Sequence, residues 1–134
     1  NRQAAITAFE ELGEMAGEAI ASAITLIDGL VVIGGGLSGA SKYILPALMR
    51  ELSGTTGMMN GNRFARLQMK PFNLENPKEL QEFLKGQVTQ VQVPGTDRWV
   101  DYDPYKRIGV AISRQGASRS IALGAYQYAL AKLK

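Results

Sequence analysis

The chain has 134 residues and a formal net charge of +3, and it contains no cysteine and no histidine. Disulfides, thiolate metal sites, histidine-bound zinc and Ser-His or Cys-His catalytic pairs are therefore excluded within it. The length suits a single domain over residues 1–134. Because no apolar run reaches the roughly 18 residues of a membrane span and no leader peptide is evident, we expect no membrane partner.

The basic residues are concentrated in the second half of the chain. Residues 1–62 contain three basic and six acidic residues, whereas residues 63–134 contain twelve basic and six acidic ones. A basic half can indicate nucleic-acid binding. Here the basic residues stand singly between acidic ones, with only Lys106 and Arg107 adjacent, and this pattern favours a solvated face with a few anion contacts.

Apolar residues at three- and four-residue steps predict one long amphipathic helix over residues 2–27. Gly13, Gly17 and Ala21 share one stripe of this helix. Small side chains at that spacing let another helix or strand approach closely, so we expect close packing there. Asp28 and the following glycine supply turn chemistry that ends the helix.

The sequence Leu-Val-Val-Ile-Gly-Gly-Gly-Leu-Ser-Gly-Ala-Ser at residues 30–41 predicts a buried parallel strand, a glycine turn and a helix that continues to Leu52. Such a turn places backbone N–H groups at a positive helix N-terminus, where a phosphate or ribose oxygen can bind. Glycine suits this place because a Cβ would keep the backbone from approaching a ligand closely.

The glycine turn has two further interpretations. Gly34-x-Gly36-x-x-Gly39 matches the dinucleotide-binding pattern, which is weak by itself. That function requires an acidic residue about 20 residues on, at the end of the next strand, whereas the strand predicted over residues 65–72 ends in Lys-Pro-Phe. The dinucleotide-binding pattern also usually lies at the start of its domain, whereas here a long helix precedes it. The third interpretation is a turn that serves only close packing.

Local patterns predict the next elements. Residues 53–62 are glycine-rich and polar and indicate a loop, and the alternation over residues 65–72 indicates a half-exposed strand. A helix start follows, with Asn76 as the N-cap, Pro77 in the first position and Glu79 three residues after the cap.

The last third of the chain adds two strands and a helix. Residues 87–93 alternate weakly, residues 108–112 alternate as a strand, and Ser118 is placed to cap a final helix with a broad apolar face. Arg114 and Arg119 bracket the start of that helix and could meet a nucleotide phosphate or a neighbouring domain. The alternation of helices and strands is typical of a layered α/β domain.

An aromatic and acidic stretch precedes the last strand. Asp101 and Asp103 flank Tyr102. On a strand their side chains would point the same way about 7 Å apart, and such a pair of carboxylates could serve as a metal or acid–base pair. Without histidine or another carboxylate nearby, a solvated turn is favoured. Trp99, Tyr102 and Tyr105 could stack a sugar, pin a hairpin to the domain or lie at an oligomer contact. We expect no catalytic residue and no metal site in this chain.

The order of four segments resembles the C-terminal part of ROK-family sugar kinases and repressors, the bacterial glucokinase-like branch of the actin and hexokinase ATPase fold. These segments are the small-residue helix at residues 12–21, the strand and glycine turn at 30–38, the Leu-Met-Arg-Glu-Leu helix end at 48–52 and the segment Gly-Ala-Ser-Arg-Ser-Ile-Ala-Leu-Gly-Ala-Tyr at 116–126. In that family the glycine turn is the adenosine motif, and the terminal Leu-Gly-Ala helix packs beside it.

The resemblance covers residues 10–53 and 108–131 well. Residues 54–107 are longer and more β-rich than the usual connection of the family, and we treat them as a β-rich insertion. The family's Asp-x-Gly-Gly-Thr phosphate loop, its Asn-Asp segment with the catalytic Asp and its zinc cluster have no counterpart here. The resemblance therefore implies that the chain is the C-terminal, nucleotide-side lobe of a two-lobed kinase. The implied fold is an α/β lobe of ribonuclease-H-like, actin-like ATPase type, with helices packed on a mixed sheet.

The implied parent activity is ATP-dependent phosphorylation of a hydroxyl group of a hexose or amino sugar. Gly34, Gly35, Gly36 and Ser38 would bind the ribose and α-phosphate of ATP, while magnesium and the catalytic aspartate belong to the N-terminal lobe. The implied partners are that lobe, which holds most of the sugar, and further copies in a homo-oligomer, in a cytoplasmic protein. This chain alone would have no catalytic activity.

Two alternatives differ from the kinase in class. The chain could be the effector or oligomerisation lobe of a sugar-responsive ROK-type repressor, which would bind nucleic acid through a helix-turn-helix upstream of Asn1. A dinucleotide-binding oxidoreductase domain is the third hypothesis, and the missing acidic residue disfavours it.

Overall fold

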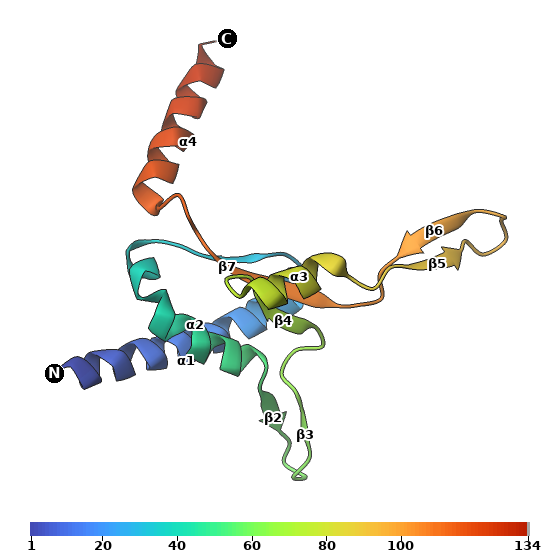
Figure 1. The fold of residues 1–134 in the computed structure, drawn as a ribbon, viewed down its shortest axis with the longest axis horizontal. Helices are drawn as coiled ribbons and strands as arrows, with labels where there is room; N and C mark the ends of the chain where they lie inside the picture. The colour runs from blue at the N-terminus through green and yellow to red at the C-terminus, as the bar shows by residue number, and fades with distance from the viewer. Residues whose placement is uncertain (134) are drawn as a thin grey trace.

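The computed structural model describes residues 1–133, and its centre is a three-stranded parallel sheet in the order β1-β7-β4 (Figure 1). Two antiparallel hairpins, β2–β3 and β5–β6, project from it. The elements in chain order are α1 (Arg2–Leu26), β1 (Val31–Ile33), the short 3-10 helix η1 (Gly36–Ala40), α2 (Ser41–Leu52), β2 (Thr55–Gly57), β3 (Arg63–Ala65), β4 (Lys70–Asn73), α3 (Pro77–Lys85), β5 (Thr89–Gln92), β6 (Trp99–Tyr102), β7 (Arg107–Ile112) and α4 (Ala117–Lys132).

One face of the sheet forms the core with α1 and α2. Successive strand residues point to opposite faces, and the register aligns Val31 of β1 with Val110 of β7 on the same face. Val110 is completely buried. The other buried members of this core are Ala21, Ile24, Leu45, Leu48, Leu52, Leu67 and Ile108.

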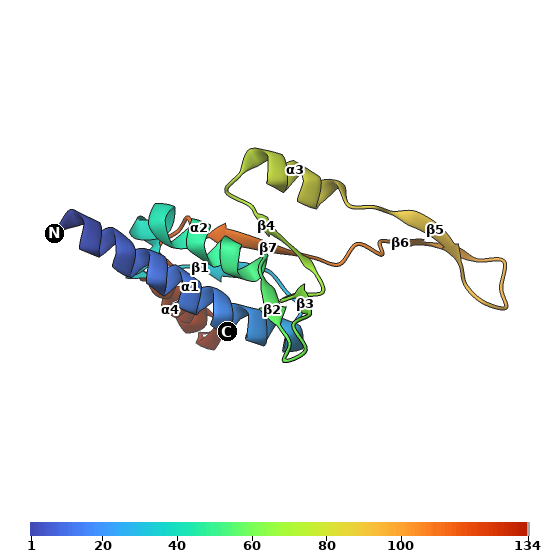
Figure 2. The ribbon, with the colours of Figure 1, turned by 90° about the horizontal axis from the view of Figure 1, so that it is seen from below.

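The opposite face is covered by α3 only beside β4. Phe72 packs edge-on against Phe83 of α3 and against Tyr105, with ring centroids 5.7 and 6.1 Å apart. The Lys70 ammonium lies 2.7 Å from the Glu82 carboxylate of α3, and this hydrogen bond raises the pKa of Lys70. Figure 2 shows α3 beside β4 and away from α1 and α2. The β1 side of this face stays open. The expected burial of this strand is therefore wrong, because no residue of β1 is buried and Val32 is 61% exposed.

The stripe of small residues on α1 lies against α2, which confirms the expected close packing. Gly13, Gly17 and Ala21 are all buried. A Cβ on Gly17 would lie 2.6 Å from the Glu51 Cβ, and one on Gly13 would lie 2.9 Å from the Ala47 Cβ and closer still to a backbone carbonyl oxygen of α2. The two helices therefore approach each other more closely than helices with side chains at these positions could.

The predicted loop over residues 53–62 and strand over residues 65–72 are partly wrong. Thr55–Gly57 forms β2, which pairs with Arg63–Ala65 as β3, and the predicted strand is split into β3 and β4. The two strands pair with different partners, because β3 bonds to β2 in a hairpin and β4 bonds to β7 in the central sheet, with the buried Leu67 between them. Tertiary packing thus interrupts an alternation that looks continuous in the sequence.

The two predicted helix caps have different outcomes. Asn76 accepts a hydrogen bond from the Lys78 N–H at 3.0 Å, as expected, and Glu79 adds a bond from the Asn76 side-chain amide at 2.9 Å. The expected Ser118 cap is wrong. The last helix begins at Ala117, with Gly116 in the cap position at φ +73° and no side-chain cap bond. Within residues 1–133, no helix is long and apolar enough to span a membrane.

The root of the β5–β6 hairpin is held by one carboxylate. Asp103 accepts hydrogen bonds from the N–H groups of Tyr105 (2.9 Å) and Gln87 (3.3 Å), and it pairs with the Arg107 guanidinium at 2.6 Å. Gly86 lies directly against this cluster with φ +61°, and a Cβ there would be 2.7 Å from the Arg107 Nη1. Position 86 therefore requires glycine both for its backbone and for its neighbours.

We predict that Gly13→Ala destabilises the chain by about 1–3 kcal/mol, because the new Cβ has to displace the α2 backbone. The matched control is Gly124→Ala in the middle of α4, where a Cβ meets nothing within 4 Å. It should be neutral or should stabilise by up to about 1 kcal/mol through helix propensity. Urea unfolding followed by circular dichroism compares the two variants, and equal effects would contradict the close contact of α1 and α2.

The second prediction concerns pH. The Tyr105 N–H bond, together with the Gln87 N–H and Arg107, holds the pKa of Asp103 below its ordinary value of 3.8. Because the folded-state pKa is lowered, the stabilisation of the hairpin root is complete above 3.8 and is lost as the pH falls through the folded-state pKa. The amide proton shifts of Tyr105 and Gln87, followed by NMR against pH, should report this titration.

The control for the pH prediction is Asp103→Asn, which should remove the titration from both amide signals. A midpoint at or above 3.8 in the unmodified chain would show that the three partners do not hold the carboxylate in its charged form.

Candidate functional site

The carboxyl ends of the three parallel strands meet at one edge of the sheet. Open α/β sheets bind ligands outside this edge. There β1 leads into Gly34, Gly35 and Gly36 and then η1, while β7 leads into Ser113 and then the turn before α4. The Ser113 N–H donates a 2.8 Å hydrogen bond to the Ile33 carbonyl, which holds the two turns side by side.

The glycine turn is shaped by one residue with an unusual backbone. Gly35 has φ +88° and ψ −172°, a conformation that is accessible essentially to glycine alone. Its carbonyl accepts the Ser38 hydroxyl at 2.8 Å and the Ser38 N–H at 3.2 Å. Since Ser38 Oγ donates its only proton to the turn, it can act toward a ligand only as an acceptor in this conformation.

The outer side of the turn is open. A Cβ on Gly35 or Gly36 would meet nothing within 4 Å, and one on Gly34 would make only an ordinary 3.5 Å contact with the Ser113 Cβ. Close packing therefore does not explain the three glycines. The turn instead leaves room for another molecule or another part of the protein to approach the backbone directly.

The helix after the turn begins differently from the prediction. Gly36–Ala40 forms a 3-10 helix, and the α-helix starts only at Ser41. A 3-10 helix is short and has poorer hydrogen-bond geometry than an α-helix, and the α-helical dipole of α2 begins only at Ser41. The expected positive N-terminus is thus weaker at the glycines than the sequence suggests, and binding there depends more on single N–H groups.

A carboxylate that the sequence analysis missed lies at the same edge. β4 ends at Asn73 and not at Phe72, so Glu75 follows the strand by two residues. Its Oε1 accepts the Ile112 N–H at 3.0 Å, and its Oε2 lies 3.7 Å from the Arg114 guanidinium. Because β7 separates β4 from the glycine turn, Glu75 anchors the end of β7 and does not reach the place that a dinucleotide ribose requires.

The aromatic and acidic stretch is not gathered into one site. Asp101 accepts a hydrogen bond from the Gln90 side chain on the β5–β6 hairpin, while Asp103 holds the root of that hairpin. Trp99 and Tyr102 are more than half exposed, and Tyr105 packs on Phe72. Within residues 1–133, no group of three or more histidine, cysteine or acidic side chains is placed to hold a metal ion.

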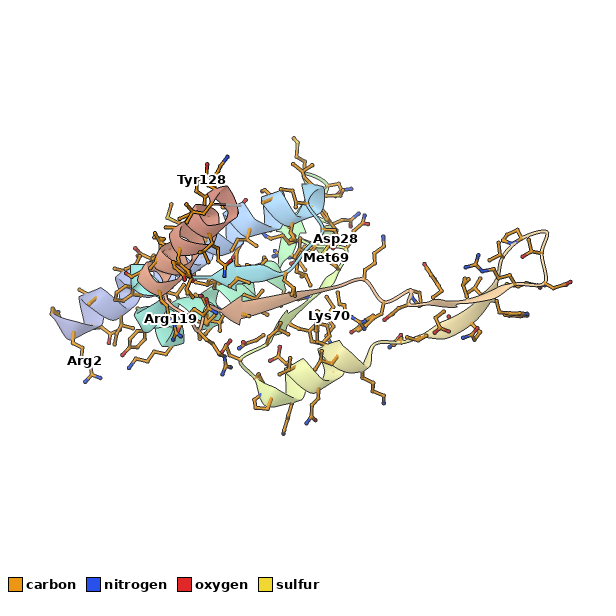
Figure 3. The ribbon with its side chains drawn as sticks, turned by 90° about the horizontal axis from the view of Figure 1, so that it is seen from above. Arg2, Asp28, Met69, Lys70, Arg119 and Tyr128 are labelled. Carbon is orange, nitrogen blue, oxygen red and sulfur yellow. The ribbon has the colours of Figure 1, made fainter. Side chains whose placement is uncertain are left out.

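A cleft at the other end of the sheet lies away from the glycine turn. It has a volume of about 730 Å³ and is lined by the end of α1 and by residues 64–69 and 102–107. Figure 3 shows its lining residues Asp28 and Met69 at the end of the sheet opposite Arg119, which lies near the start of α4. The cleft therefore does not extend the candidate site at the carboxyl edge.

The final helix starts beside the glycine turn but does not pack there, so the expected packing is wrong for the described residues. Figure 1 shows α4 running away from the body of the molecule. All of its residues are exposed, including Ile121 at 72% and Tyr128 at 68%. Arg119 and Arg114 lie in the same region and are both exposed.

A comparison with solved structures finds a glucokinase from Parabacteroides distasonis ATCC 8503, with 62% sequence identity and a TM-score of 0.79. The match covers 97% of this chain and 34% of the glucokinase chain, so this chain spans about a third of the length of the protein that it resembles. No family model and no curated protein matches the chain. The fold is that of a glucokinase C-terminal lobe, a mixed α/β lobe of the actin-like ATPase fold.

We predict that Gly35→Ala destabilises the chain by about 1–3 kcal/mol, because alanine is strained at φ +88°. Gly36→Ala should be close to neutral, since Gly36 has neither a positive φ nor a neighbour in the direction of its Cβ. Thermal unfolding of both variants is the measurement. A neutral Gly35→Ala would mean that the turn has another conformation in solution.

Proposed function

We propose that this chain is the C-terminal, nucleotide-side lobe of a ROK-type sugar kinase, which transfers a phosphoryl group from ATP to a hydroxyl group of a hexose or amino sugar. The observation that carries this proposal is the 62% identity to a glucokinase over 97% of the chain. At this identity and coverage, glucose is the first sugar to test. The same observation favours the kinase over the repressor and over the oxidoreductase.

In this proposal the glycine turn binds the ribose and α-phosphate of ATP. The open space above Gly35 and Gly36 supports close approach of a phosphate to the backbone. Ser38, with its proton committed to the Gly35 carbonyl, offers a lone pair to a ribose hydroxyl. Gly34 follows Ile33, whose carbonyl accepts the Ser113 N–H at 2.8 Å, and this bond holds the turn against the end of β7.

The chemistry of phosphoryl transfer belongs to the second lobe. Transfer needs a base, magnesium and a site closed to water. As the family resemblance implies, we assign magnesium and the catalytic base to the N-terminal lobe, which also holds most of the sugar. The contribution of this chain is to bind and orient the nucleotide, which lowers the entropic part of the barrier.

The final helix supports the presence of a second lobe. α4 exposes apolar side chains along its length, among them Ile121, Leu123, Tyr126 and Leu130. An exposed apolar surface of this kind marks a contact with another body. We assign this contact to the N-terminal lobe. Because α4 starts next to the glycine turn, a lobe packed on it would form the second wall of a nucleotide cleft.

We predict that Gly36→Leu in the complete protein raises the Kd and the KM for ATP at least tenfold and leaves the KM for the sugar nearly unchanged. The leucine side chain would fill the space above the turn without disturbing the fold. Isothermal titration with ATP and a coupled assay of sugar-dependent ADP formation are the measurements.

The matched control is Gly57→Leu on β2, where a Cβ also meets open space but lies far from the turn in the chain. It should leave ATP binding unchanged. If Gly36→Leu also binds ATP as the wild type does, the nucleotide lies elsewhere. A thermal shift produced by NAD(P) and not by ATP would favour the oxidoreductase.

A further inference from the structure

The β5–β6 hairpin, residues 88–102, projects from the molecule as an arm that no other element within residues 1–133 covers (Figures 1 and 2). Every residue of β5 is exposed, and on β6 Trp99 is 58% and Tyr102 55% exposed. An isolated two-stranded hairpin is marginally stable in water. The arm therefore has the features of a segment that gains its stability from a partner.

The two edges of the arm differ in chemistry. The segment Val-Thr-Gln-Val-Gln-Val at residues 88–93 contains no charge and no proline, whereas the β6 side carries Arg98, Asp101 and Asp103. Soluble proteins normally protect a free strand edge with charged residues, proline or a bulge. β6 is protected in this way and β5 is not, which points to β5 as the edge that pairs with another strand.

The register identifies the free main-chain groups of β5. The Val93 N–H donates to the Arg98 carbonyl at 2.8 Å, and the aligned pair Val91 and Val100 continues this ladder two residues further along. In an antiparallel pair, alternate residues bond inward. The N–H and C=O groups of residues 88, 90 and 92 therefore point outward.

We propose that β5 pairs antiparallel with β5 of a second copy of the protein, about a two-fold axis that passes through Gln90. In this register Gln90 lies opposite Gln90 of the second copy, and Val88 lies opposite Gln92. Each outward group then has a partner, and the two arms form one four-stranded sheet. An uncharged edge is complementary to itself, because no like charges meet across the axis.

The root of the arm supports this pairing. Asp103, Arg107 and the positive φ of Gly86 fix the direction in which the arm leaves the body. A fixed arm loses little entropy when it pairs. The arm also leaves from the amino end of β7, at the opposite end of the strand from the glycine turn, so the pairing does not occupy the proposed nucleotide site.

The test uses the complete protein with Gln90→Lys or Gln90→Glu. In the proposed register either change places two like-charged side chains opposite each other across the axis, on Cα atoms about 5.5 Å apart. Each variant alone should weaken self-association at least tenfold and sediment at half the wild-type mass. An equimolar mixture should recover the wild-type mass, because lysine then lies opposite glutamate.

The matched control is Asp101→Lys, which places lysine on the same rung of the arm but on the β6 edge. It should keep the wild-type mass. Gln90→Pro is a second variant that removes the outward N–H, which a strand edge tolerates, together with the Gln90 side chain and its bond to Asp101. It should dissociate the protein without any change of charge. Circular dichroism spectra and unfolding temperatures check that each variant is folded.

Three results would overturn the proposal. A wild-type protein that is monomeric at micromolar concentration has no such pairing. If the Gln90→Lys and Gln90→Glu variants keep the wild-type mass, β5 does not lie at the interface between copies. If these variants keep that mass and also unfold at a lower temperature, β5 contacts the rest of the same protein. A mixture of Lys and Glu variants that stays dissociated would exclude the axis at Gln90.

Discussion

The position of β7 between β1 and β4 is the constraint on which the rest of the structure depends. The strand bonds to both neighbours in parallel, and its central residue, Val110, is completely buried. At its carboxyl end the Ser113 N–H holds the glycine turn, and at its amino end Arg107 holds the root of the β5–β6 arm. One strand thus places both proposed binding regions, at opposite ends of the sheet.

Features that depend on residues close together in the chain could be predicted from the sequence. The long first helix, the strand and glycine turn at residues 30–36, and the Asn76 cap follow from spacing and local hydrogen bonding, and the structure confirms them. Features that depend on distant residues could not. The predicted strand over residues 65–72 is divided because its two ends pair with different partners, β2 and β7, and no local signal marks this.

The candidate site shows the same division. The sequence identified the glycines, whose role is local, but it did not find the Ser113 bond that positions them or the Glu75 carboxylate that anchors β7. Both depend on the register between strands that are far apart in the chain. For the last helix the sequence pattern predicted more packing than the described residues provide. Its apolar face predicts burial, yet within residues 1–133 nothing covers it.

The placement of Trp99 has a consequence for spectroscopy. It is the only tryptophan of the 134 residues, and it lies on the β5–β6 arm, outside the core around Val110. Tryptophan emission from this chain therefore reports on the arm, whereas far-ultraviolet circular dichroism reports mainly on the helices. Denaturation curves from the two signals need not coincide, and a gap between them would show that the arm opens separately and would not by itself be evidence of a compact folding intermediate.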